Sequence, residues 1–180
     1  MSMPPLLTDR LTVRPLSTGD AAAVAATVES TEPGWLEWTE AGYHQLSQLH
    51  QPPYGERAVT LHESDELVGL VGVVPSMGPF RQLPGFAEPA AAEPARFRPE
   101  VGLYWALAPR HRGHGYATEA AAAVIAYCFA ELNIERIVAT TEFHNTASIA
   151  VMRRLGMTVA HNSLPEPHWF QVVGWLDAPA

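Results

Sequence analysis

The feature that most constrains the fold is a basic, glycine-rich turn between an apolar strand and a helix. Residues 100–108 read as a strand, residues 110–115 (RHRGHG) follow, and residues 115–132 have the composition of a helix. Glycines let the backbone approach a ligand closely, and the unpaired N–H groups of a first helical turn favour an anion. This order of elements predicts an anion-binding turn in a domain of strands and helices.

The charge of this turn is opposite to that of the chain. The formal net charge is −8, yet Arg110 and Arg112 stand in the turn beside His111 and His114, and no acidic residue intervenes before Glu119. Guanidinium groups suit phosphate, because they offer a fixed charge and several donors. A glycine turn with solvated arginines is the plainer alternative, but the combination of strand, turn and helix favours a phosphate site.

Several other chemistries are excluded or disfavoured. A dinucleotide fingerprint needs a third glycine five residues after Gly113, where Thr118 stands. All 11 basic residues are arginine, so a Schiff-base lysine and a phosphate loop ending in Gly-Lys-Ser/Thr are impossible. Cys128, the single cysteine, shares a helical stripe with Ala121 and Val124 and is predicted to be packed rather than catalytic. No metal site is expected.

The composition also bears on partners and location. A net charge of −8 disfavours nucleic acid and anionic membrane surfaces, and favours a cationic substrate. The apolar run 120–130 is shorter than the roughly 20 residues that span a bilayer. Residues 1–5 do not resemble the start of a secretory signal, and one cysteine suits a reducing compartment. We therefore expect a cytoplasmic protein with no membrane association.

The length and pattern predict one domain over residues 1–180. A hairpin is expected in the first half, and strands joined by single helices later make part of the sheet parallel. Closely spaced prolines in residues 75–99 predict a loop without regular structure. The fold class is therefore α/β (α+β), a mixed sheet flanked by helices. The expected strands are 11–16, 57–63, 66–74, 100–108, 136–142, 158–162 and 169–176, and the expected helices are 21–29, 40–51, 115–132 and 146–155.

Several of these segments together resemble the GNAT N-acetyltransferase superfamily. Residues 110–115 fill its signature [Gln/Arg]-x-x-Gly-x-[Gly/Ala], and further matches are residues 11–16, 100–105, 145–148 and 154–157. They are most similar to the branch that includes ribosomal-protein N-terminal acetyltransferases. The resemblance implies a single, twisted and mostly antiparallel sheet with splayed central strands, and acetyl-CoA as co-substrate.

The resemblance also implies which residues bind the cofactor. Backbone N–H groups of the turn would hold the CoA pyrophosphate, and backbone groups of the preceding strand would hold the pantetheine and polarise the thioester. Asn145 would hydrogen-bond the cofactor, and Ser148 would lie near its sulfur. The complete implied set is Trp105, Ala106, Leu107, Arg110, Arg112, Gly113, His114, Gly115, Tyr116, Ala117, Asn145 and Ser148.

Acetyl transfer to an amine needs a base for the amine and an acid for the leaving thiol. Strand alternation places Glu100 on one face with Gly102 and Tyr104, and Glu100 resembles an acid found there in related enzymes; it is the predicted base. Many relatives use a tyrosine as the acid where this chain has Met152, which we interpret as a core residue. Ser148, Tyr104 or bound water would then act as the acid.

The acceptor is predicted only as a primary amine of a small molecule or a peptide. Trp35, Trp38 and Tyr43 fall where the family's acceptor lid lies and would shape the acceptor pocket, although core packing also explains such aromatic residues. A non-catalytic acyl-CoA-binding or sensor domain is the alternative function, and a nucleotide oxidoreductase has poor motif support. Exposed sheet edges in this class of fold could support a homodimer.

Overall fold

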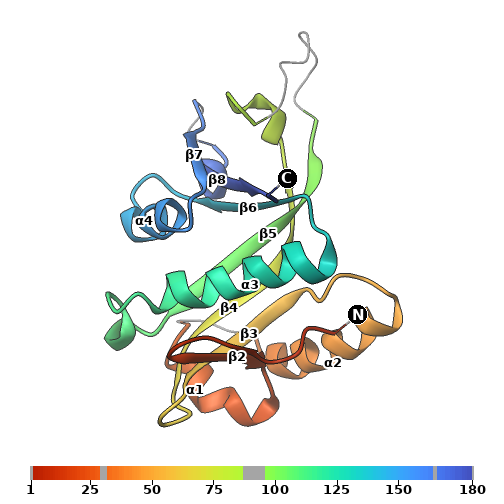
Figure 1. The fold of residues 1–180 in the computed structure, drawn as a ribbon, viewed down its shortest axis with the longest axis vertical. Coiled ribbons are helices and arrows are strands. Elements are labelled where there is room, and N and C mark those ends of the chain that lie inside the picture. The colour runs from red at the N-terminus through yellow and green to blue at the C-terminus, as the bar shows by residue number, and fades with distance from the viewer. Residues whose placement is uncertain (1, 29–31, 87–95, 164–165, 180) are drawn as a thin grey trace. The chain divides into compact units, whose positions relative to one another are not determined.

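The chain folds as a mixed sheet with helices packed on it (Figure 1), in a computed structural model that describes residues 2–28, 32–86, 96–163 and 166–179. The strand order is β1-β2-β3-β4-β5-β6-β8-β7, and β5 pairs with β6 in parallel. This confirms the predicted fold class. The strands are β1 (Leu6–Leu7), β2 (Leu11–Pro15), β3 (Gly55–Leu61), β4 (Leu67–Gly78), β5 (Arg98–Leu107), β6 (Arg136–Thr141), β7 (Thr158–His161) and β8 (Val172–Asp177), and the α-helices are α1 (Ala21–Ala25), α2 (Trp35–Gln48), α3 (Tyr116–Leu132) and α4 (Thr146–Arg154).

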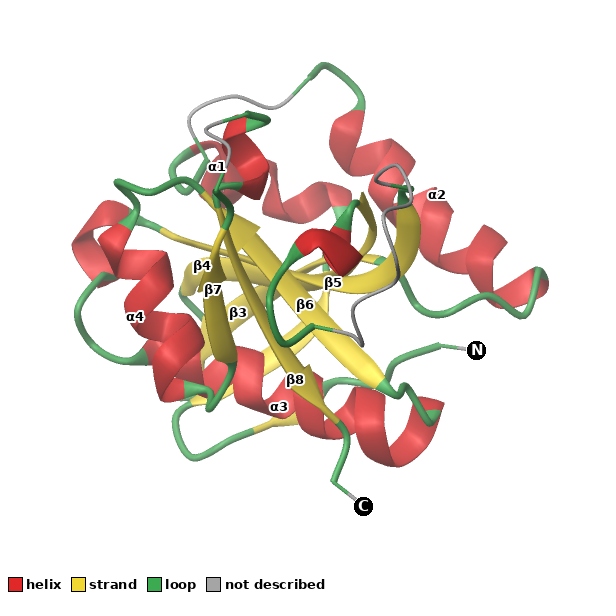
Figure 2. Ribbon diagram, turned by 90° about the horizontal axis from the view of Figure 1, so that it is seen from above, coloured by secondary structure: helices red, strands yellow, loops and turns green. Residues whose placement is uncertain are grey.

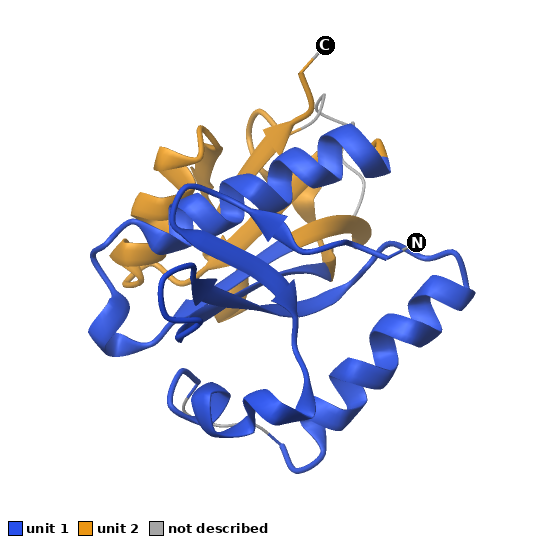
Figure 3. Ribbon diagram, turned by 60° about the horizontal axis from the view of Figure 1, so that its bottom comes forward, with its two compact units in different colours: residues 1–74, 103–132 blue, residues 75–102, 133–180 orange. Residues whose placement is uncertain are grey.

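The residues group into two compact units, coloured separately in Figure 3. Unit 1 comprises Met1–Val74 and Leu103–Leu132, and unit 2 comprises Pro75–Gly102 and Asn133–Ala180. Strands β4 and β5 each contribute residues to both. The expectation of one domain over residues 1–180 remains a prediction.

In unit 1, helices cover both faces of the strands (Figure 2). The helix α3 contacts β1 and β2 through small and apolar side chains, among them the fully buried Ala121 and Val124. Cys128 on the same stripe is buried, and loss of hydration raises the pKa of its thiol to about 12. The prediction that Cys128 is a packed residue is therefore confirmed. A second cluster joins α1 and α2 to the strands: Leu16, Val24, Leu36, Ala58, Leu67 and Leu70.

In unit 2, alternate residues of β8 serve two different packing layers. Gly174 faces α4, because a Cβ at this position would lie 3.1 Å from the sulfur atoms of Met152 and Met157. Met152 is fully buried, which confirms it as a core residue. The neighbouring residues Val173 and Trp175 belong to an aromatic cluster on the other side, whose remaining members are Phe80, Leu83, Phe86, Val138 and Phe170.

The proline-rich segment is more regular than predicted. The strand β4 runs through Pro75 to Gly78, a 3-10 turn covers Phe80–Gln82, and β5 starts at Arg98; residues 87–95 lie outside the described residues. The β3–β4 register begins with Gly55 opposite Val73, so Pro75 lies beyond the end of β3. No residue of β3 lies opposite Pro75 to accept a hydrogen bond, so the missing N–H of proline does not interrupt β4.

Three other boundaries also differ from prediction. The helix α2 starts at Trp35, five residues earlier than expected, because Gly34 adopts a positive φ of 78° at its N-cap. The helix α1 ends at Ala25, and the final residue of the predicted helix, Glu29, lies outside the described residues. The predicted last strand begins instead at Val172, after a 3-10 turn over His168–Phe170. This displacement exposes Trp169.

A pair of glycine substitutions tests the packing of unit 1. A Cβ at Gly72 would lie 2.4 Å from the Gly55 carbonyl oxygen, whereas a Cβ at Gly42 in α2 meets nothing within 4 Å. We expect Gly72→Ala to destabilise the fold by roughly 1–3 kcal/mol, and Gly42→Ala to stabilise it by about 0.5–1 kcal/mol. Urea unfolding of both variants checks this. Equal stability of the two variants would contradict the close approach of β3 and β4.

Candidate functional site

The turn before α3 has the backbone geometry of an anion site. Gly113 and Gly115 have φ angles of 82° and 84°, a region that other residues adopt only with strain. A Cβ at Gly113 would meet no atom within 4 Å, so space is open beside its backbone. The Glu119 N–H donates to the Gly115 carbonyl, and the helical N–H groups before it have no partner one turn earlier. This arrangement offers donors and the positive end of a helix dipole to an anion.

The arginine and histidine side chains of this turn make contacts within the protein that anchor it. The Arg110 Nη2 lies 2.8 Å from Glu66 Oε1, and the Nε2 of His111 lies 3.2 Å from the same oxygen. These two partners lower the pKa of Glu66, through hydrogen bonds from Arg110 first and His111 second. Arg112 donates from Nε to the Leu107 carbonyl at 3.1 Å, which ties the turn to the end of β5. In this geometry the backbone, more than the side chains, is left to contact a ligand.

A second anchor comes from the turn between β1 and β2. The Glu119 carboxylate accepts a hydrogen bond from the Thr8 hydroxyl at 2.6 Å, and others from the Arg10 N–H at 2.9 Å and the Arg10 Nε at 2.8 Å. Arg10 Nη1 also donates to the His114 carbonyl at 3.1 Å. The Arg10 guanidinium lies 4.7 Å from the centre of the Tyr116 ring, on which His114 stacks.

Arg10 and Glu66 are therefore site residues that the sequence analysis missed. Arg10 stands more than a hundred residues from the turn, and Glu66 lies at the start of β4 beyond the hairpin turn. Neither has a local motif. One feature of the sequence could have identified Arg10: its charge is opposite to that of Glu119, the first acidic residue of α3.

The end of β5 lies close against β4 in unit 1. A Cβ at Gly69 would come within 2.6 Å of the Ala106 carbonyl oxygen, and Ala108 donates its N–H to the Val68 carbonyl at 3.0 Å. Tyr104 packs against the cluster beneath α1 and α2, and burial raises the pKa of its phenol. Trp105 and Ala106 are half-buried. The strands β5 and β6 pair at Val101 with Ile137 and at Gly102 with Val138. Trp105 and Ala106 lie beyond these pairs.

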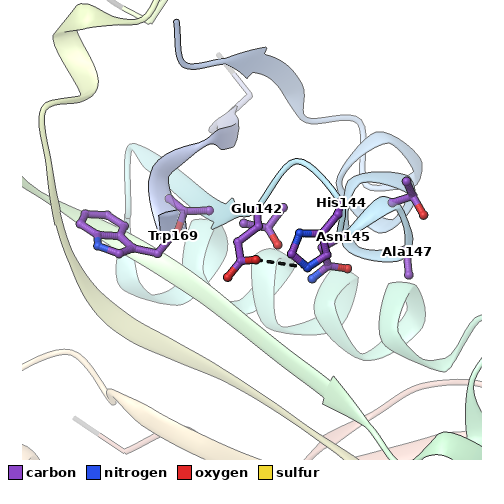
Figure 4. A pocket seen from close by; sticks show the side chains of 8 residues that line it. Glu142, His144, Asn145, Ala147 and Trp169 are labelled. Atoms are coloured by element: carbon purple, nitrogen blue, oxygen red, sulfur yellow. Dashed lines mark ion pairs between the residues drawn. The ribbon is translucent and has the colours of Figure 1, made fainter. Parts of the chain in front are cut away.

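Unit 2 has a pocket of about 480 Å³ at the end of β6 (Figure 4). Asn145, predicted to bind the cofactor, caps α4 because its Oδ1 accepts the Ser148 N–H at 3.1 Å. The carboxylate of Glu142 and the Nε2 of His144 lie 3.2 Å apart. Ser148 is half-buried one turn into the helix and does not line the pocket. The lining residues are Thr140, Thr141, Glu142, His144, Asn145, Thr146, Ala147 and Trp169.

Glu100, the predicted base, lies at the other end of β6. The parallel register places it level with Arg136, five residues before Thr141. At about 3.3 Å per residue, this is roughly 16 Å along the strand from the pocket. Burial raises the pKa of Glu100, although the positive charge of Arg136 opposes the shift. Unit 2 therefore does not bring Glu100 together with Asn145.

The three predicted acceptor residues differ in what they contact. Trp35 packs against the core cluster of unit 1. The Tyr43 hydroxyl donates to the Glu56 carbonyl and accepts the Leu16 N–H, and its ring lies 5.0 Å from the Arg57 guanidinium carbon. Trp38 is 73% exposed. Of the three side chains, Trp38 has the most surface available to a ligand.

Neither a metal-binding cluster nor a membrane-spanning helix is found in residues 2–28, 32–86, 96–163 and 166–179. These residues contain no group of three or more His, Cys, Asp or Glu side chains placed to hold a metal ion. No helix formed by them combines the length and apolar character needed to cross a membrane.

Comparison with known proteins relates this geometry to one family. The family model described as "Acetyltransferase (GNAT) domain" matches residues 10–158. An uncharacterized N-acetyltransferase of Bacillus subtilis, YnaD, is 43% identical over 58 residues, which are 32% of this chain and 33% of YnaD. The chain's matches thus span about a third of the length of its curated relatives.

Two solved structures share the fold. An acetyltransferase from Agrobacterium tumefaciens has a TM-score of 0.67 and 26% identity, over 98% of this chain and 95% of that one. A ribosomal-protein-S5-alanine acetyltransferase from Vibrio fischeri has a TM-score of 0.64 and 17% identity, over 98% of this chain and 97% of that one. The predicted resemblance to a branch with ribosomal-protein acetyltransferases is confirmed at the level of the fold.

The Glu119 anchor makes a prediction about stability and pH. Burial raises the pKa of Glu119, but hydrogen bonds from Thr8 and Arg10 outweigh it and lower the pKa below its ordinary value. A depressed folded-state pKa stabilises the fold above the unfolded value near 4.3, and this gain is lost as the pH falls through the folded pKa. We expect Glu119→Gln to cost roughly 1–2 kcal/mol at pH 7, and less below pH 4.

Urea unfolding of Glu119→Gln and the parent at a series of pH values measures this difference. Glu131→Gln is the matched control, because Glu131 is an exposed carboxylate on the same helix. A difference from the parent that is independent of pH, or an equal effect of Glu131→Gln, would contradict the anchor.

Proposed function

Because the chain belongs to the GNAT acetyltransferase family, we propose that it transfers an acetyl group from acetyl-CoA to a primary amine of a small molecule or a peptide. The observation that carries this proposal is the turn before α3. Its two glycines adopt left-handed conformations, and open space lies beside Gly113. Such a turn at a helix N-terminus suits a pyrophosphate better than it suits an uncharged ligand.

The residues of the turn fit the CoA pyrophosphate. We assign the contacts to the backbone N–H groups of residues 112–117, with the positive charge of Arg112 nearby. Arg110 and His114 act mainly by holding the turn, since their side chains contact Glu66 and the Arg112 carbonyl. When bound, acetyl-CoA supplies an acetyl group that is activated as a thioester.

The remaining cofactor assignments concern the acyl end. Backbone groups of Trp105, Ala106 and Leu107 are proposed to hold the pantetheine, because they belong to the part of β5 beyond its register with β6. Asn145 is proposed to donate from its amide nitrogen, since its Oδ1 already caps α4.

Two side chains remain candidates for the acid that protonates the leaving thiol. Tyr104 is one candidate, because its phenol, whose pKa burial raises, carries a proton at neutral pH. Ser148 is the other candidate, at the first turn of α4. Met152 cannot take this role, because a thioether carries no acidic proton, and its side chain is fully buried in the core.

Glu100 is the proposed base from the sequence, and its surroundings bear on that role in two ways. A raised pKa favours proton acceptance, because a more basic carboxylate binds a proton more readily. Its position level with Arg136 limits the role to an amine that approaches the start of β6. Glu100→Gln with unchanged turnover would exclude it as the base.

The acceptor is proposed as a cation at neutral pH, because the chain carries a net charge of −8. The Vibrio fischeri enzyme is named for the alanine of a ribosomal protein, and this makes a peptide N-terminus one candidate. Small diffusible amines are the other. A non-catalytic acyl-CoA-binding domain is the second candidate function, because the buried Met152 stands where many relatives have the acid. Such a domain would bind acetyl-CoA but would show no amine-dependent thiol release.

Two matched glycine substitutions test the pyrophosphate site. Gly113 and Gly156 have similar φ angles, 82° and 78°, and a Cβ at either would meet nothing within 4 Å. Alanine at each position therefore introduces the same backbone strain, but only Gly113→Ala places a methyl group in the proposed cradle. We expect Gly113→Ala to weaken acetyl-CoA binding roughly tenfold or more, and Gly156→Ala to retain the parent affinity. Calorimetric titration measures both, and equal affinities would refute the assignment.

A further inference from the structure

The pocket at the end of β6 holds a carboxylate and an exposed indole that the assignments above do not use. Glu142 directly follows β6, and Trp169 lies in the 3-10 turn before β8. Figure 4 shows the Glu142 carboxylate between the indole of Trp169 and the imidazole of His144. Trp169 remains 44% exposed, although tryptophan usually packs more completely.

Both walls are held in place by buried groups. The Trp169 ring makes an edge contact with Phe170, which is fully buried, at a centroid distance of 5.4 Å. Gln171 is 8% exposed and accepts the Phe143 N–H at 2.9 Å, while its Nε2 lies 3.3 Å from the Nδ1 of His168. One buried side chain thus connects the loop that carries Glu142 to the turn that carries Trp169. These contacts hold both walls of the pocket through groups of the protein itself.

Three kinds of group in the lining suit a cation. Glu142 supplies a negative charge, and the face of an indole attracts an ammonium group through its quadrupole. The hydroxyls of Thr140 and Thr141 can accept hydrogen bonds from it. The lining contains no arginine, and its other polar groups are the His144 imidazole, 3.2 Å from Glu142, and the start of α4, where the Asn145 Oδ1 already accepts the Ser148 N–H.

We infer that this pocket is the subsite that binds the protonated amine of the acceptor, with Glu142 as its ion-pair partner and Trp169 as its aromatic platform. The inference deepens the proposed function and rests on it for the identity of the acceptor. His144 orients the Glu142 carboxylate from 3.2 Å away. An amine held here lies at the opposite end of β6 from Glu100 and next to the His144 imidazole, so an acceptor bound in this pocket excludes Glu100 as its base.

Binding of a simple cation tests the inference without acetyl-CoA. The probe is n-butylamine at pH 7, where it is an ammonium ion, and n-butanol is the uncharged analogue of similar shape. The measurement is the titration shift of the Trp169 indole N–H in a nitrogen–proton correlation spectrum, assigned with Trp169→Phe. We expect n-butylamine to shift this resonance saturably, and n-butanol to leave it nearly unchanged.

Two glutamate variants make the test specific. Glu142→Gln should weaken n-butylamine binding roughly fivefold, which corresponds to the loss of one partly exposed ion pair. Glu166→Gln is the matched control, because Glu166 lies 3.2 Å from His168 in an exposed pair outside the pocket lining. This control should bind n-butylamine like the parent. The same spectra report whether each variant is folded.

Three results would overturn the inference: equal shifts with n-butanol, no shift with either probe, or unchanged affinity in Glu142→Gln. None of them would bear on the proposed function, because that function depends on acetyl-CoA binding at the turn before α3. Conversely, loss of acetyl-CoA binding with retained n-butylamine binding would refute the proposed function while leaving a cation site in unit 2.

Discussion

The backbone conformation at Gly113 and Gly115 is the constraint on which the candidate cofactor site depends. Both φ angles lie in the left-handed region, so the chain can turn within a few residues and enter α3 with its N–H groups unpaired. The surrounding side chains maintain this conformation from three directions. Glu66 holds Arg110, Arg112 holds the end of β5, and Glu119 with Arg10 holds the His114 carbonyl. The positive charges of the turn are thus partly neutralised by the protein itself, and a ligand would meet mainly backbone donors.

The local parts of this account could be predicted from the sequence, because they depend on residues that are close together in the chain. The order of strand, glycine turn and helix is local, and so is the spacing that buries Cys128 and Met152. The anchors were not predictable in this way. Arg10 and Glu119 are 109 residues apart, and only the fold brings a flexible arginine on one strand turn against one particular helix.

Tertiary context also overrode local signals in unit 2. Proline usually ends a strand, but β4 continues through Pro75. Pro75 lies beyond the last residue of β4 that pairs with β3, so no hydrogen bond between the two strands is lost. Trp169 has strand propensity, yet it forms part of a 3-10 turn and exposes its ring to the pocket. Glu142 carried no motif, and its relation to Trp169 depends on the long-range contact of Gln171 with the Phe143 N–H. A residue that lines a pocket can therefore be invisible to patterns of composition and spacing.

The turn before α3 is proposed to recognise the pyrophosphate of acetyl-CoA. The most direct measurement compares two ligands by calorimetric titration of the full chain: acetyl-CoA, and S-acetylpantetheine, which carries the same thioester but no pyrophosphate. We expect acetyl-CoA to bind at one molecule per chain and S-acetylpantetheine to bind far more weakly. Equal affinities for the two ligands, or no binding of acetyl-CoA to the folded protein, would contradict this proposal.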